Sequence, residues 1–176
     1  MNRSHQLMTY CWGIAILLFM CCAKSPQKTS QSGAQRVVSR PVLTGWLTES
    51  QLLGDLPAYQ LEKDKYQPDM ETVAPLQNLE QDIEIIVFLG TWCPDSQREV
   101  PRFLKIIETI QNRNITVKML GLDRSKRDPE GVAEAHDIQF VPTFVALRGE
   151  AELGRIVEQP IVTIEQDLVE IIESLQ

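Results

Sequence analysis

Two apolar runs in the middle of the chain have the length and composition of buried β-strands. The first is Ile83–Leu89, in which β-branched and other apolar residues fall on both sides of the alternating pattern. The second is Ile115–Leu122. Strands that are apolar on both faces are typical of the centre of a sheet that is covered on both sides. We therefore predict that these two segments are central strands.

Between these two runs, the apolar residues recur with the spacing of an amphipathic helix. The positions of this pattern are Val100, Phe103, Leu104, Ile107 and Ile110. Such spacing places them on one helical face, so we expect a helix from about Asp95 to Asn112. A strand, a helix and a second strand in this order predict a parallel, right-handed unit.

Weaker helical signals precede the first strand. The pattern predicts a short helix at Gln51–Leu53, with Thr48 or Ser50 as its N-cap and with Gly54 and Pro57 as the residues that stop it. Met70–Leu79 also has helical spacing, and we expect this segment to cover the sheet. Both helices belong on the surface of the predicted strand–helix–strand unit.

The region after the second strand predicts a hairpin between two helices. A short helix is expected to begin at Pro129 and to end near Ala135. Thr143–Leu147 and Leu153–Val157 flank a glycine-containing turn, which is typical of a β-hairpin. A final amphipathic helix starts at Thr163. The whole order of elements predicts an α/β domain with a mixed sheet.

Cys93 lies where the first strand leads into the long helix, and it is the only cysteine beyond the first 22 residues. The unpaired N–H groups and the dipole at a helix N-terminus favour a thiolate over a thiol. Pro94 fits the first helical turn, where its missing N–H has no partner to lose. Cys93 is therefore a candidate nucleophile. The alternative is a buried structural cysteine, which is common for this residue type.

Three separated motifs resemble those of the thioredoxin-like superfamily. Trp92–Ser96 resembles the W-C-x-x-C signature, with serine in place of the second cysteine, and Pro101 matches the proline of the active-site helix. Val141–Phe144 resembles the loop whose cis-proline faces the cysteine. Trp92–Phe103 also fits the W-C-x-D-S-x-x-E-V-P-x-F signature of monothiol family members. The resemblance covers roughly residues 80–176, with a weaker likeness from Gly45 onward. It implies a thioredoxin-like fold, with a central mixed β-sheet flanked by helices.

The resemblance also implies roles for individual residues. Cys93 is expected to attack a disulfide, and Ser96 either hydrogen-bonds the thiolate or caps the helix. Ser96 cannot form a disulfide, and Val87 occupies the position of the buried carboxylate that the family usually has. The residues that the resemblance places beside the substrate are Trp92, Pro94, Val141 and Pro142.

Two functions fit this set of residues. The first is thiol–disulfide exchange, as reduction or isomerisation of protein or small-molecule disulfides through a mixed disulfide at Cys93. It requires an external thiol or a reductase to resolve the mixed disulfide. The second is a membrane-tethered module that binds peptides without chemistry. Neither function requires a cofactor, and no metal-ligand spacing is present in the sequence.

The N-terminus has the pattern of a secretory signal. Arg3 precedes an apolar run from Leu7 to Ala23, and Cys21 and Cys22 are candidates for lipidation. We expect a signal peptide of lipoprotein type over 1–22, a flexible tether over 23–44 and the domain over 45–176. These features predict an extracytoplasmic, membrane-anchored bacterial lipoprotein, on the periplasmic face or the cell surface. The alternative is an uncleaved signal anchor.

The charge balance argues against one class of partner. The chain has 17 basic and 24 acidic residues, which gives a formal net charge of −7. Binding of nucleic acid requires a strongly basic face, so nucleic acid is not an expected partner. The simplest explanation of the acidity is a well-solvated surface.

Overall fold

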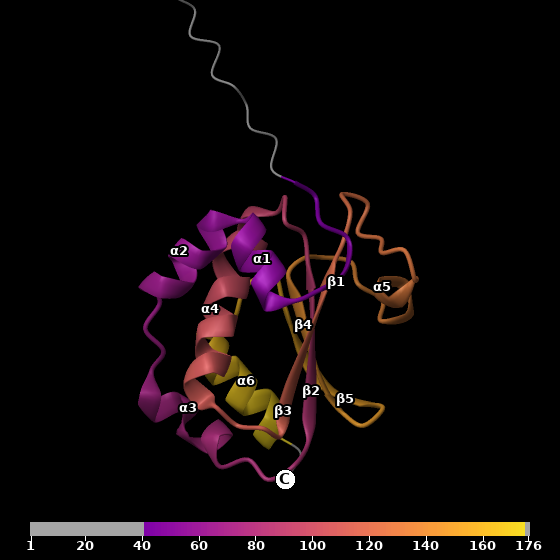
Figure 1. Cartoon of the computed structure of the whole chain (residues 1–176). Helices are drawn as coiled ribbons and strands as arrows, with labels where there is room; N and C mark the ends of the chain where they lie inside the picture. The colour runs from indigo at the N-terminus through magenta and orange to yellow at the C-terminus, as the bar shows by residue number, and fades with distance from the viewer. Residues whose placement is uncertain (1–40, 175–176) are drawn as a thin grey trace, which may run out of the picture. The chain divides into compact units, whose positions relative to one another are not determined.

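A mixed sheet of five strands runs through the computed structural model, which describes residues 41–174 (Figure 1). The strands are β1 (Gly45–Leu47), β2 (Ile83–Leu89), β3 (Ile115–Gly121), β4 (Thr143–Arg148) and β5 (Ala151–Val157). Their order across the sheet is β1-β3-β2-β4-β5. β2 and β3 are parallel, whereas every other neighbouring pair is antiparallel. The predicted α/β architecture with a mixed sheet is confirmed.

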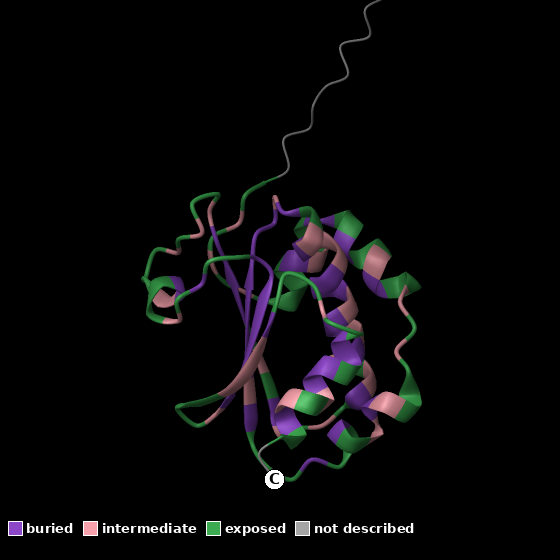
Figure 2. Ribbon diagram, turned by 180° about the vertical axis from the view of Figure 1, so that it is seen from behind, coloured by how far each residue is buried: buried purple, intermediate pink, exposed green. Residues whose placement is uncertain are grey.

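Helices cover the two faces of this sheet unequally. The helices are α1 (Glu49–Asp55), α2 (Pro57–Lys65), α3 (Met70–Gln77), α4 (Pro94–Ile110), α5 (Val132–Ala135) and α6 (Ile164–Glu173). Five of them lie on one face, and the short α5 lies on the other (Figures 1 and 2). Two apolar clusters result, one beneath the five helices and a smaller one that includes Cys93 beneath α5.

The two central strands and the long helix agree with the sequence-based prediction. β2 and β3 pair in parallel from Ile83 opposite Ile115 to Leu89 opposite Gly121. α4 begins at Pro94, and Phe103 on its apolar face is fully buried. Full burial of one such side chain contributes about 2 kcal/mol to stability. This packing fixes the start of α4 at the carboxyl end of β2.

The region before β2 differs from the prediction in one helix. α1 has Thr48 as its N-cap, with a capping box formed by Thr48 and Gln51. α1 ends before Pro57, as predicted, and Pro57 occupies the first turn of a second helix, α2. A proline is well accommodated there, because an N–H group in the first helical turn has no hydrogen-bond acceptor within the helix. The prediction of Gly54 as a stop was wrong, because Gly54 lies inside α1, and α2 was not predicted.

The region after β3 contains a shorter helix than predicted. α5 starts at Val132, and Pro129 lies outside it. The preceding turn is held by Asp128, whose carboxylate accepts hydrogen bonds from the N–H groups of Glu130, Val132 and Ala133. The predicted hairpin is present as β4 and β5, and Thr163 is the N-cap of α6.

The predicted signal peptide over 1–22, with Cys21 and Cys22, lies outside the described residues, as does most of the predicted tether over 23–44. Within residues 41–174, no helix combines the length and the apolar content needed to cross a membrane. The first described residues pass over the end of β3, where a Cβ on Gly121 would lie 2.4 Å from the Leu43 carbonyl oxygen. A glycine at 121 therefore allows this close passage.

Candidate active site

Cys93 is the N-cap residue of α4, as the sequence predicts for the helix start. Its N–H donates to the Gly90 carbonyl at 2.8 Å, and its carbonyl accepts from the Gln97 N–H at 3.1 Å. The thiol makes no capping hydrogen bond to the helix. Backbone hydrogen bonds therefore fix the position of Cys93, and the Cys93 sulfur takes no part in capping the helix.

The sulfur faces the loop before β4. The Val141–Pro142 peptide bond is cis, and the Cys93 thiol donates a hydrogen bond to the Val141 carbonyl oxygen at 3.1 Å. Only 7% of Cys93 is exposed. Within residues 41–174, the Val141 N–H makes no hydrogen bond. The structure thus brings three predicted site residues together and leaves one backbone donor beside the thiol unused.

Trp92 covers the ends of the two central strands. Its indole Nε1–H donates to the Leu122 carbonyl at 3.1 Å, and its ring lies against Gly90, where a Cβ would be 2.8 Å from the nearest ring atom. The guanidinium carbon of Arg124 lies 5.4 Å from the ring centroid. Trp92 is therefore held rigidly next to Cys93, with one cationic side chain over its ring.

Ser96 has a different role from the two that the sequence suggested. Its side chain is fully buried, and its hydroxyl oxygen accepts a hydrogen bond from the Gly90 N–H at 3.1 Å. It does not cap the helix, because Cys93 is the N-cap. Nor does it hydrogen-bond Cys93 in the described part of the chain, because the oxygen points back to the end of β2. Ser96 instead ties the first turn of α4 to the preceding strand.

Thr91 has contacts at this site that the sequence did not predict. Its side chain is fully buried, and its hydroxyl donates to the Pro41 carbonyl at 2.8 Å and accepts from the Leu43 N–H at 3.1 Å. Gln97 adds a hydrogen bond from its amide to the Thr91 carbonyl at 2.9 Å. No sequence pattern identifies these contacts, since the partners of the hydroxyl lie far away in the chain.

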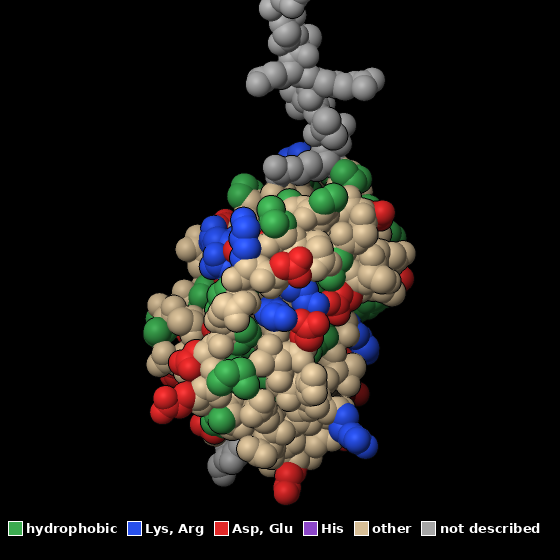
Figure 3. Space-filling view, turned by 60° about the vertical axis from the view of Figure 1, so that its left-hand side comes forward, with side chains coloured by type: hydrophobic (Ala, Val, Ile, Leu, Met, Phe, Trp, Pro, Cys, Tyr) green, Lys and Arg blue, Asp and Glu red, His purple; other side chains and the backbone are tan. Residues whose placement is uncertain are grey.

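Charged side chains at the start of α4 are paired with one another. Arg98 contacts Asp95 at 2.8 Å and also donates to Glu99. In Figure 3, acidic and basic side chains lie close together near the middle of the visible face. The Asp95–Arg98 pair is partly exposed, so it contributes little to stability.

The buried carboxylates lie on the helices and not on β2. Val87 is fully buried in the core, at the position where the family usually has an acid. Glu165 is also buried, and it accepts a hydrogen bond from the Tyr66 hydroxyl at 2.8 Å. Burial and this hydrogen bond raise the pKa of Tyr66, so the hydroxyl stays protonated as a donor. No cluster of three or more potential metal ligands occurs among residues 41–174.

Comparisons with known proteins agree with this geometry. A protein of unknown function from Pseudomonas aeruginosa has a TM-score of 0.55 and 19% identity, over 68% of this chain and 84% of its own. An HIV epitope scaffold has a TM-score of 0.52 and 17% identity, over 70% and 81%. At these identities the matches establish the fold alone. No curated protein matches the chain significantly.

A family model described as thioredoxin matches residues 57–170. The match spans more than half of the chain and includes the Cys93 turn, α4 and the cis-proline loop. It therefore agrees with the resemblance seen in the sequence motifs and with the mixed sheet of the structure. The protein belongs to the thioredoxin family.

Proposed function

We propose that this domain performs thiol–disulfide exchange with one cysteine, through a mixed disulfide at Cys93. The observation that carries the proposal is the position of the thiol at the start of α4, 3.1 Å from the carbonyl of the residue before the cis-proline. A helix N-terminus stabilises the negative charge that a sulfur nucleophile must carry. The site therefore combines a nucleophile with a backbone surface for its substrate.

In the proposed reaction, the Cys93 thiol first loses its proton to solvent. The thiolate then attacks one sulfur of a substrate disulfide, so that a new S–S bond forms at Cys93 and the second sulfur leaves as a thiolate. The Val141 N–H has no partner in the described structure. An extended substrate peptide would accept this hydrogen bond as an added strand.

The mixed disulfide must be resolved from outside this domain. Cys93 is the free cysteine of the described residues, and Ser96 takes the place of a second thiol in the signature. A thiol of the substrate, a small thiol or a separate reductase would therefore attack the bond. This requirement favours reduction or isomerisation over net oxidation, because the domain has no internal disulfide to donate.

The test uses a full-length chain in which Cys11, Cys21 and Cys22 are replaced by serine, here called the single-cysteine chain. Incubation with glutathione disulfide should increase its intact mass by one glutathione, and dithiothreitol should reverse the increase. A further Cys93→Ser replacement is the matched control and should show no increase. A single-cysteine chain that stays unmodified while folded would contradict the proposal.

The second candidate function is peptide binding without chemistry. It is favoured by the half-exposed apolar side chain of Phe140, the residue before Val141, and by the small exposure of Cys93. A binding module would retain affinity for an extended peptide after Cys93→Ser and would form no adduct before it. A thiol exchanger would lose covalent capture in that variant.

We also propose that the protein is an extracytoplasmic lipoprotein, which rests on the sequence of residues 1–22 alone. Metabolic labelling with a palmitate analogue should mark the natural chain. The label should be lost when both Cys21 and Cys22 are replaced by serine. Equal labelling of the two proteins, or labelling of neither, would overturn this proposal and favour an uncleaved anchor.

A further inference from the structure

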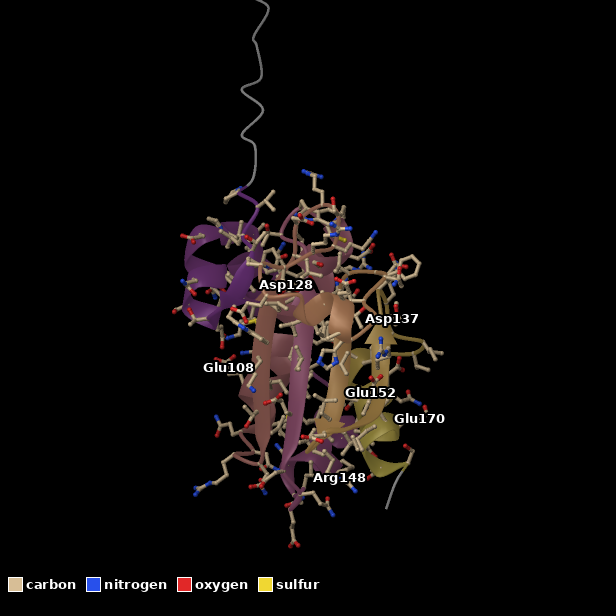
Figure 4. All side chains as sticks on the ribbon, turned by 90° about the vertical axis from the view of Figure 1, so that its right-hand side faces the viewer. Glu108, Asp128, Asp137, Arg148, Glu152 and Glu170 are labelled. Carbon is tan, nitrogen blue, oxygen red and sulfur yellow. The ribbon has the colours of Figure 1, made fainter. Side chains whose placement is uncertain are left out.

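A basic loop lies beside the thiol site. Arg124, Lys126 and Arg127 follow the end of β3, and this loop starts next to the loop after β2 because Leu89 is paired with Gly121. The labelled Asp128, which ends the basic loop, lies toward the opposite end of the domain from Arg148 (Figure 4). Figure 3 also shows basic side chains gathered near the end of the domain where the described chain begins.

These three cations have no carboxylate partner among residues 41–174. Six other basic side chains, in contrast, lie within 4.0 Å of an acidic group. Lys65, Arg113 and Arg148 are likewise unpaired within residues 41–174, so the basic loop is distinguished by having three unpaired cations within four consecutive positions of a protein with a net charge of −7. Arg124 and Arg127 are exposed, and Lys126 is partly buried. The basic loop therefore keeps its charge available to a ligand.

The acidic side chains nearest in sequence to the basic loop already accept hydrogen bonds from backbone N–H groups. One carboxylate oxygen of Asp123 accepts from the N–H groups of Ser125 and Arg127 at 2.8 and 3.0 Å. Asp128 accepts from three further N–H groups, the shortest bond being 2.8 Å from Ala133. Burial raises the pKa of Asp128, but these hydrogen bonds outweigh burial and hold the pKa below its ordinary value.

Arg124 is the cation that the structure places best. Its guanidinium lies over the Trp92 ring, and Trp92 directly precedes Cys93. This cation–π contact uses none of the N–H donors of the guanidinium. A planar guanidinium with free donors is well suited to bind a carboxylate with two hydrogen bonds. The carboxylate would then lie at the rim of the thiol site.

We propose that Arg124, assisted by Lys126 and Arg127, makes the site selective for anionic disulfides, meaning those with carboxylates close to the reacting sulfur. This inference rests on the proposed exchange reaction at Cys93. Attraction by the basic loop raises the local concentration of anionic substrates and orients them toward the thiolate. The bond changes are those of ordinary exchange, so no further reactant is needed.

The test compares three small disulfides of different charge. The probes are glutathione disulfide, which is anionic, hydroxyethyl disulfide, which is neutral, and cystamine, which is cationic. Rates of adduct formation are measured by intact mass for the single-cysteine chain at physiological ionic strength. Each rate is divided by the rate of the same probe with the chain unfolded in urea, which removes the intrinsic reactivity of the probe.

The folded chain should favour the anionic probe over the cationic one after this correction. Arg124→Gln should lower that preference by roughly fivefold, as expected for the loss of one exposed charge contact. The neutral probe reports any general loss of reactivity. Arg113→Gln is the matched control, because Arg113 is also exposed and without an ion pair in the described structure but lies between α4 and β3.

The outcomes distinguish a failure of the anionic selectivity from a failure of the exchange reaction at Cys93. A preference that is unchanged by Arg124→Gln, or a corrected rate that is equal for all three probes, overturns the anionic selectivity alone. Failure of all three probes to react with the folded chain overturns the exchange reaction, and the selectivity falls with it. An equal loss in Arg113→Gln would attribute the effect to overall charge and would also overturn the role of Arg124.

Discussion

The two ends of α4 are built in opposite ways. At the C-terminal end, Gln111 adopts a left-handed conformation with φ 53°, and the Asn112 amide donates to the carbonyls of Leu76 and Leu79 at 2.9 and 2.8 Å. At the N-terminal end, the Cys93 side chain caps nothing and the Val141 N–H has no partner in the described structure. We call the C-terminal end, at Gln111 and Asn112, the closed end, because its polar groups are hydrogen-bonded. We call the N-terminal end, at Cys93 and Val141, the open end, because a donor there is unpaired.

This difference assigns stability to the closed end of α4 and reactivity to the open end. Most buried polar groups in proteins are paired, so a donor left unpaired beside a thiol requires an explanation. The closed end holds α3, α4 and β3 together without any reactive group. The open end holds its backbone through Thr91 and Ser96 and keeps Cys93 and Val141 for a ligand. Changes at the closed end should therefore affect stability, whereas changes at the open end should affect reactivity.

The largest loss of stability is expected at the closed end. Asn112→Ala removes the hydrogen bonds to Leu76 and Leu79 and leaves partly buried carbonyls unpaired, which should cost about 2 kcal/mol of unfolding free energy. Urea denaturation should show a lower midpoint with an unchanged slope. The rate of adduct formation at Cys93 should stay the same under native conditions.

Asn78→Ala is the matched control for this prediction, because Asn78 makes one exposed hydrogen bond to a carbonyl at 3.2 Å. Its effect should be within about 0.5 kcal/mol. A slower reaction of Cys93 in Asn112→Ala, while the chain is fully folded, would show that the two ends of α4 are coupled and would break the comparison.

A smaller and pH-dependent effect is expected at Asp128. Asp128→Asn weakens the charge-assisted bonds to the N–H groups before α5 and should cost about 1.5 kcal/mol at neutral pH. The folded chain holds the pKa of Asp128 below its ordinary value. This stabilisation is therefore complete above about pH 4, the ordinary value, and is lost as the pH falls through the lower folded-state value.

Unfolding free energies of the natural chain and Asp128→Asn should therefore converge as the solution becomes more acidic. Glu134→Gln is the control, since Glu134 is exposed and its carboxylate makes no ion pair in the described part of the chain. A difference between the natural chain and Asp128→Asn that grows toward low pH would reverse the sign of the argument.

The smallest loss of stability is expected at the open end. Thr91→Val removes the hydrogen bonds to Pro41 and Leu43 and should cost about 1 kcal/mol. Because Thr91 lies two residues before Cys93, the adduct should also form more slowly. Thr91→Ser keeps the hydroxyl and should retain most of the rate. Equal rates in Thr91→Val and the natural chain would limit Thr91 to a structural role.

Local patterns in the sequence predict most of the fold. Apolar periodicity locates β2, β3 and α4, because each of these elements buries a complete face or stripe. The helix start at Cys93 follows from the same pattern, and the cis bond before Pro142 was expected from the family motif. These features depend on residues that are close together in the chain.

The misses are contacts between distant segments. Pro57 lies beyond the end of α1 as predicted, but it also starts α2, a helix that packs against α4 and was not predicted. The hydrogen bonds of Thr91 and the cation–π contact of Arg124 with Trp92 join residues far apart in sequence. Ser96 was placed in the correct turn, but the direction of its hydroxyl depends on the backbone of Gly90.

The most direct test of the open end is amide hydrogen exchange at Val141. The single-cysteine chain is measured in its reduced form and as a mixed disulfide with an extended peptide that contains one cysteine. We expect the Val141 amide to exchange at least about tenfold more slowly in the adduct, because the peptide accepts its hydrogen bond. Unchanged exchange at Val141 in a fully formed adduct would show that this unpaired donor does not receive the substrate.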